Sequence, residues 1–151
     1  MPVNSCIQMT PEQIAQGEAK WEEVRLKLPA MAESGLEYMS PNDFQFATFM
    51  LRRIHYLATD GVVDSPERIE AWIKQLKAYG FVAAGTNYEA VEDVLVAECC
   101  LALDRDDWAL VHLKSAIETG HRNQGDGARM AVLRLVAMGR EADVDAVLGG
   151  I

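Results

Sequence analysis

Histidine and cysteine are the residue types in this chain best suited to bind a metal or to act as nucleophiles. There are six of them: His55, His112, His121, Cys6, Cys99 and Cys100. No two of the histidines share the spacing of a zinc site, and no Cys-x-x-Cys or His-Glu-x-x-His segment is present. We therefore expect no catalytic site, no metal and no cofactor.

The cysteines fit a structural role better than a chemical one. Cys99 and Cys100 lie in a stretch that is apolar on nearly all sides, where a thiol behaves as a small hydrophobic group with a raised pKa. An odd number of cysteines, two of them adjacent, does not form a disulfide framework. A reducing compartment is consistent with this, and we predict a cytoplasmic protein.

A polar stripe at helical spacing, formed by Thr48, Arg52 and His55, is the other candidate for chemistry. Two interpretations are open. We favour a solvated or locally hydrogen-bonded helix face. The alternative is a polar pocket in a small-ligand-binding or enzymatic domain.

Charge is unevenly distributed along the chain. With 14 basic and 23 acidic residues the net charge is −9, so we expect no nucleic-acid partner. Residues 89–107 hold seven acidic residues against Arg105, whereas residues 121–140 hold four arginines against Asp126. We interpret these runs as solvated faces and as ion pairs between neighbouring helices.

The same charged segments also supply the candidate surface for a protein partner. A partner that is basic, or that presents an amphipathic helix, would be matched by acidic and aromatic groups beside arginines. The candidate partner-binding residues are Glu92, Asp93, Asp104, Trp108, Arg129 and Arg134.

Helix starts are marked by a capping residue followed by proline, as in Thr10-Pro11 and Ser65-Pro66, and several helix ends are marked by glycine. Apolar residues recur at helical spacing between these marks, for example Ile14, Trp21 and Val24. The predicted helices run from Thr10 to Pro29, Phe44 to Ala58, Ser65 to Gly80, Thr86 to Leu103, Asp106 or Asp107 to Gly120, Ala128 to Met138 and Glu141 to Leu148.

No segment shows sustained alternation of apolar and polar residues, so the predicted fold class is all-α. Short connections at 104–107 and 139–140 require antiparallel neighbours, which gives stacked antiparallel helical hairpins or a compact bundle of about seven helices. We assign residues 1–9 to a flexible tail and 10–151 to a single domain. We expect no signal peptide, no membrane span and at least two buried tryptophans among Trp21, Trp72 and Trp108.

Residues 88–148 resemble tetratricopeptide repeats. Ala109, Leu113 and Ala116 form a small-large-small ladder similar to the second helix of that repeat, and Leu101 and Leu135 are separated by the repeat length of 34. The resemblance implies stacked hairpins that bind a protein segment. The alternative is a helical bundle with no repeat.

The turn at 59–67 resembles the interhelical turn of TerB-like tellurite-resistance proteins and the second half of an EF-hand loop, with Gly61 at the bend and Glu67 at the bidentate position. Tyr56 and Ala58 occupy the places of the first acidic ligands. We interpret the turn as the end of one helix and the start of the next, and we expect no calcium binding.

These observations favour a non-enzymatic protein-interaction module, a chaperone or adaptor that binds a segment of a partner protein. An acidic inhibitor or immunity-type protein that neutralises a basic toxin enzyme is the alternative. A small-ligand-binding or enzymatic helical domain is the second alternative. The sequence leaves open whether the chain forms a homo-oligomer.

Overall fold

The structure is a computed structural model that describes residues 9–29, 45, 49, 52–53, 65–78, 89–120 and 127–151. In these ranges every element of regular structure is a helix, which confirms the all-α prediction. The helices are α1 (Pro11–Arg25), α3 (Pro66–Ala78), α4 (Glu89–Ala102), α5 (Asp106–Thr119), α6 (Gly127–Ala137) and α7 (Glu141–Gly149). None of the helices in the described part of the chain is both long enough and apolar enough to cross a bilayer.

The described residues thus contain six helices where about seven were predicted. The predicted helix at 44–58 lies outside the described residues except for four positions that are helical. These are Gln45, Phe49, Arg52 and Arg53. The stripe partners Thr48 and His55, and the turn at 59–64, also lie outside the described residues.

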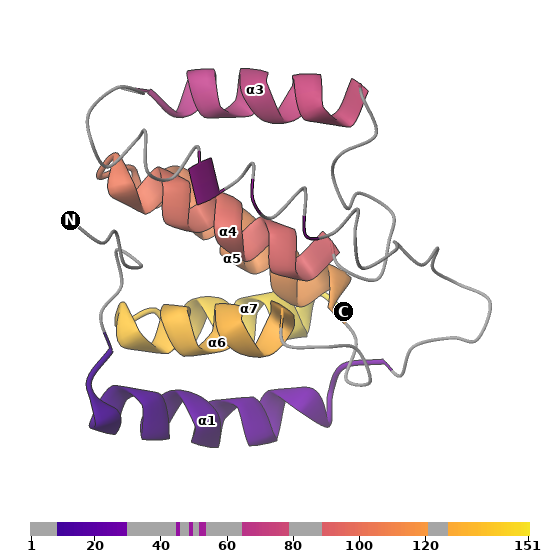
Figure 1. Cartoon of the computed structure of the whole chain (residues 1–151). Helices are drawn as coiled ribbons and strands as arrows, with labels where there is room; N and C mark the ends of the chain where they lie inside the picture. Colours follow the sequence, from indigo (N-terminus) through magenta and orange to yellow (C-terminus); the bar gives the residue numbers. More distant parts are fainter. Residues whose placement is uncertain are drawn as a thin grey trace.

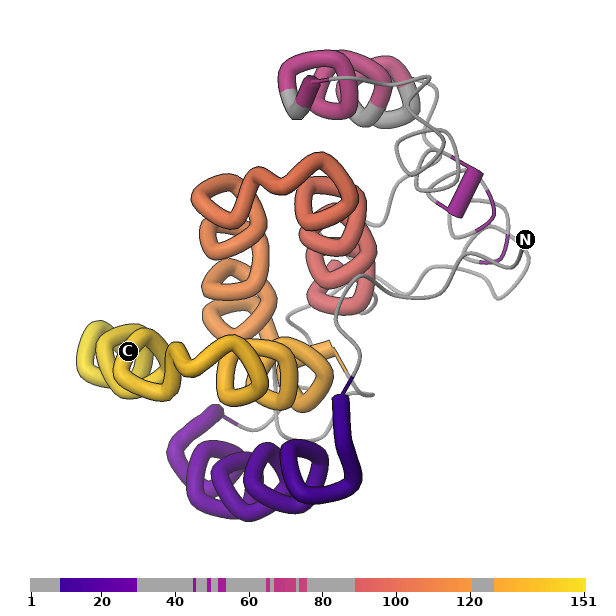
Figure 2. The backbone as a smooth tube through the Cα atoms, turned by 90° about the vertical axis from the view of Figure 1, so that its left-hand side faces the viewer, coloured from indigo at the N-terminus to yellow at the C-terminus, as the bar shows by residue number. Residues whose placement is uncertain are grey.

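The helices form layers, with two hairpins at the centre and a single helix at each end (Figures 1 and 2). Helices α4 and α5 make the first antiparallel hairpin, and α6 and α7 make the second. Helix α6 packs against both α4 and α5, so the two hairpins share one core. Helix α1 covers α6 at one end of the stack, and α3 covers α4 at the other.

Helix α1 begins as the sequence predicts. The Thr10 side chain accepts a hydrogen bond from the Gln13 backbone N–H at 3.2 Å, and the Gln13 side chain accepts one from the Thr10 backbone N–H at 2.9 Å. This reciprocal capping box satisfies two backbone donors that a helix start otherwise leaves unpaired. The helix ends at Arg25, one turn before the predicted end at Pro29.

The central hairpins pack through small residues. Ala109, Leu113 and Ala116 on α5 are fully buried, as the small-large-small pattern requires. A Cβ atom added to Gly127, the first residue of α6, would lie 2.6 Å from the Cβ of Ala90 and 2.7 Å from backbone atoms of α4. Only glycine allows α6 to begin this close to α4. Cys99 and Cys100 are also fully buried in this core, which confirms their predicted structural role.

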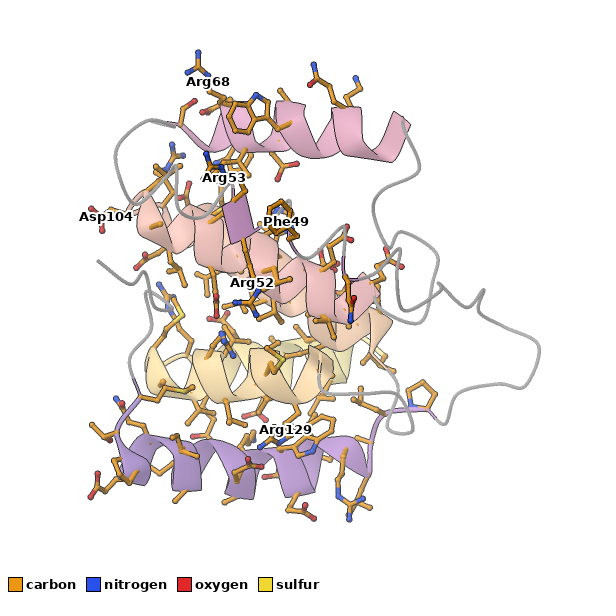
Figure 3. All side chains as sticks on the ribbon, in the orientation of Figure 1. Phe49, Arg52, Arg53, Arg68, Asp104 and Arg129 are labelled. Carbon is orange, nitrogen blue, oxygen red and sulfur yellow. The ribbon has the colours of Figure 1, made fainter. Side chains whose placement is uncertain are left out.

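Helix α1 is held by close packing and by ion pairs. Gly17 faces Leu133 on α6, and a Cβ atom at Gly17 would lie 2.8 Å from Leu133 Cγ. Trp21 and Val24 are buried on the same side of α1, and Glu18 receives a two-point ion pair from Arg129 of α6. Arg129 lies between α6 and α1 (Figure 3).

The three tryptophans correct one prediction. Trp21 is buried, whereas Trp72 and Trp108 are only partly buried and pack against the edge of the core. Trp72 lies on α3 and Trp108 lies near the start of α5. Only one buried tryptophan is therefore present where at least two were expected.

Candidate functional site

A cleft of about 560 Å³ lies between α3 and α5. It is lined by Glu70 of α3 and by Asp107, Trp108, Val111 and His112 of α5. Asp107 and Trp108 lie one helical turn before Val111 and His112, so these four residues share one face of α5. The volume is in the range of protein ligand pockets, roughly 300–1,000 Å³.

The edge of the cleft is apolar and open. Val111 is 65% exposed although it is a large hydrophobic residue, and Trp108 is partly exposed beside it. Arg105 lies 5.9 Å from the centre of the Trp108 ring and donates two hydrogen bonds of 3.1 Å to Asp107. The bond from Arg105 lowers the pKa of Asp107, so this rim carboxylate is ionised at neutral pH.

His112 closes the inner side of the cleft and connects three helices. Its Nε2 atom lies 2.8 Å from Glu70 Oε1 on α3, and its Nδ1 atom lies 3.3 Å from Asp93 Oδ1 on α4. Ser115, one turn further along α5, donates a hydrogen bond of 3.0 Å to the other oxygen of Asp93. We call the contacts among Glu70, His112 and Asp93 the His112 bridge.

The two carboxylates favour the protonated form of the ring. Burial lowers the pKa of His112, but hydrogen bonding to Asp93 and to Glu70 raises it by more, so the net shift is upward. An imidazolium can donate from both nitrogens, which satisfies both carboxylates at once. While the ring is protonated, the bridge is therefore a charged connection between helices.

This arrangement is poorly suited to acid-base or nucleophilic catalysis. Both nitrogens of His112 already face carboxylates, so neither is directed at a substrate in the cleft. Ser115 donates to Asp93 rather than to His112, so the pair lacks the hydrogen bond by which a base activates a hydroxyl. Cys100 is fully buried, and burial followed by the charge of Glu70 raises the pKa of its thiol to about 12.

A second hollow of about 430 Å³ lies between α1 and the α6–α7 hairpin, with Lys20 at its wall. The Lys20 ammonium lies 2.7 Å from Asp145, 3.5 Å from Glu23 and 3.6 Å from Glu141. The hydrogen bond to Asp145 raises the pKa of Lys20. Lys20 is thus an internal connection between α1 and α7, because carboxylates of both helices already surround its ammonium.

Two of the six predicted partner-binding residues require correction. Glu92 and Arg134 are buried, and Arg134 forms an ion pair with Glu98 across the α4–α6 contact. Their burial follows from the position of α4 and α6, which are covered by other helices on several sides. These two side chains are not part of a surface in this structure.

The other four residues lie in different places. Arg129 pairs with Glu18, and Asp93 belongs to the His112 bridge. Asp104 is exposed in the turn between α4 and α5, with a positive φ of 56° that aspartate tolerates better than most residues (Figure 3). Trp108 is the one predicted residue that lines the cleft. The arginines thus confirm the interpretation of pairing between neighbouring helices.

Glu70, Val111 and the bridging role of His112 were not predicted from the sequence. The partners of His112 come from positions 19 and 42 residues away along the chain, which no local spacing reveals. One clue was available, since Val111 is an apolar residue on the face of α5 opposite the buried ladder of Ala109, Leu113 and Ala116.

Metal binding has no candidate among the residues that the structure describes, since no three His, Cys, Asp or Glu side chains are grouped to hold an ion. Comparison with known proteins adds no identification. No protein-family model, no curated protein and no solved structure matches this chain.

Proposed function

We propose that this chain is a non-enzymatic protein-interaction module, a chaperone or adaptor, that binds a segment of a partner protein in the cleft between α3 and α5. The observation that carries the proposal is the pair of exposed Val111 and partly exposed Trp108 at the edge of that cleft. Isolated apolar side chains are common on protein surfaces, but an aromatic and an aliphatic residue beside a cleft supply the kind of anchor site that binds a partner side chain.

The charges around the cleft define the partner. Glu70 and Asp107 line it, and Asp104 and Asp106 are exposed at the nearby start of α5. Arg105, which lies beside Trp108 at this rim, is already paired with Asp107. A segment that carries Lys or Arg one turn away from an apolar side chain complements both features.

A partner segment fits the cleft better than a small substrate does. Small-molecule sites bury most of their ligand, whereas Val111 at the edge of this cleft is largely exposed. The adjacent His112 has both nitrogens engaged and is not directed at a bound molecule. A cytoplasmic location remains a prediction that accords with this role.

The acidic inhibitor remains the second candidate, because Asp104, Asp106 and Asp107 are exposed together where α5 begins. The two functions differ in the source of affinity. An adaptor that buries an apolar side chain depends on Trp108 and Val111, and an inhibitor of a basic enzyme depends on the three aspartates and on ionic strength.

The test uses a fluorescently labelled amphipathic peptide of leucine and lysine, with a leucine and glutamate peptide of the same pattern as its control. We expect the lysine peptide to bind the wild type and the glutamate peptide to bind far more weakly. Val111→Ser should weaken binding of the lysine peptide about tenfold, because it removes the apolar contact. Glu118→Lys, an exposed change elsewhere on α5, is the matched control and should weaken it little.

Two results would change the conclusion. If Val111→Ser has no effect while Asp106→Lys with Asp107→Lys abolishes binding and high salt does the same, the acidic inhibitor becomes the better function. If neither peptide binds, or if Glu118→Lys is as damaging as Val111→Ser, the cleft is not a docking site for a basic apolar segment.

A further inference from the structure

Among the described residues, helix α3 packs mainly against α4, through a small interface. Its Ile69 side chain is fully buried. Arg68 points away from the molecule on its outer side (Figure 3). The Glu70–His112 contact of 2.8 Å joins α3 to α5.

We propose that the His112 bridge is a pH-sensitive connection, which holds α3 on the α4–α5 hairpin while His112 is protonated and weakens when His112 loses its proton. The inference concerns the folded chain alone and does not depend on a partner. It identifies α3 as the movable wall of the cleft.

The chemistry of imidazole gives the reason. A protonated ring donates to Glu70 and to Asp93 together, whereas a neutral ring has one N–H and one lone pair. After deprotonation one of the two carboxylates faces that lone pair, and the contact becomes repulsive instead of attractive. Asp93 also receives a hydrogen bond from Ser115, so the neutral ring loses less at Asp93 than at Glu70.

The charged groups around His112 strengthen this effect. Helix α3 contributes Glu70 next to the ring and Glu67, whose charge acts on Arg105, and α4 contributes Asp93 together with the neutral thiol of Cys100. Helix α5 contributes Asp107, which lines the same cleft, and Arg105, which is paired with it. Loss of the His112 charge therefore leaves Glu70 and Asp93 facing a neutral ring.

The pH window follows from the direction of the shift. The pKa of His112 is raised in the folded structure, so the attachment is fully present below the ordinary histidine pKa of about 6.5 and is lost as pH rises through the raised value. The contact between His112 and Asp93 remains when α3 separates from the hairpin. Only the part of the His112 pKa shift that Glu70 causes therefore contributes to the docking of α3.

Hydrogen exchange of the full chain, followed by mass spectrometry between about pH 6 and about pH 8.5, tests the proposal. Amides of α3 are compared with those of α6, after correction for the intrinsic pH dependence of exchange. We expect the protection factors of α3 amides to fall as pH rises, while those of α6 stay constant. The fall should be about tenfold for each pKa unit by which docking of α3 raises the pKa of His112. The midpoint should coincide with the titration of the His112 ring followed by NMR in the same protein.

Glu70→Gln should remove most of this pH dependence and lower the pKa of His112. Arg68→Gln, on the outer side of the same helix, should leave both unchanged. Constant α3 protection in the wild type, or a midpoint that does not match the His112 titration, would overturn the proposal without reference to any variant. Unaltered pH dependence in Glu70→Gln would overturn it as well. Because no peptide is involved, these results are separate from the outcome of the docking experiment.

Discussion

Helices α1 and α3 occupy equivalent positions at opposite ends of the helix stack, yet they are attached in different ways. Helix α1 buries Trp21 and Val24, approaches α6 through Gly17 and adds ion pairs around that packing. Among its described residues, helix α3 buries Ile69 and makes a titratable contact with the hairpin, from Glu70 to His112.

This difference in packing indicates which end of the helix stack is the better candidate for a functional site. Extensive apolar packing makes an element part of the cooperative core, and thin packing lets it separate at a small cost in free energy. The cleft lies beside the thinly packed helix. Partner-binding elements are generally drawn from such regions because they must adapt to what they bind.

The largest expected effect comes from truncating the buried anchor of each helix. Trp21→Ala should reduce the free energy of unfolding by about 4 kcal/mol, because it removes a buried aromatic side chain and leaves a cavity. Ile69→Ala should reduce the free energy of unfolding by less. The reason is that this substitution can remove at most the free energy by which α3 docks on the hairpin. Chemical denaturation gives both values.

Hydrogen exchange sharpens this result. Ile69→Ala should expose the amides of α3 while those of α6 remain protected. Equal losses of global stability in the two variants, with uniform exchange along the chain, would show that α3 belongs to the cooperative core and that the contrast is wrong. Ile14→Ala on α1, where the side chain is 40% exposed, is the control for a change without a cavity.

The close approach of α1 to α6 predicts a smaller effect. Gly17→Ala would place a methyl group 2.8 Å from Leu133 Cγ and 3.0 Å from its backbone, so α1 must shift. We expect a loss of about 2 kcal/mol in the free energy of unfolding, typical of overpacking. Gly149→Ala on α7 meets no atom within 4 Å and should be neutral or slightly stabilising. If the two variants have the same melting temperature, α1 is packed less closely against α6 than these distances indicate.

The helix caps give the smallest effect. Thr10→Ala removes the side-chain half of the capping box on α1 and should lower the free energy of unfolding by about 1 kcal/mol. Ser65 accepts a hydrogen bond of 3.3 Å from the Arg68 backbone N–H at the start of α3, so Ser65→Ala should alter exchange in α3 with little change in the melting temperature. A larger fall in melting temperature for Ser65→Ala than for Thr10→Ala would contradict the proposed difference between the two ends.

Much of the fold was accessible from local pattern. The all-α class, the capping box of α1 and the core role of Cys99 and Cys100 were predicted correctly, because each depends on residues within a few positions of one another. Helix boundaries in the described ranges fell within a few residues of those predicted. The candidate site was predicted only at Trp108. Glu70 comes from another helix, and Val111 and His112 share a face of α5 with Trp108 but were not recognised as lining a cleft.

The sequence by itself determined which segments are helices, which residues cap them and that small residues on α5 would be buried, because helical spacing and backbone hydrogen bonding are local properties. Tertiary structure alone decided which charges meet. Glu92 and Arg134 became buried, Arg129 paired with Glu18, and His112 came between Glu70 and Asp93. The physical reason is that a carboxylate gains its partner from the packing of helices, and neither the angle between two helices nor the choice of neighbour is encoded in the spacing along any one of them.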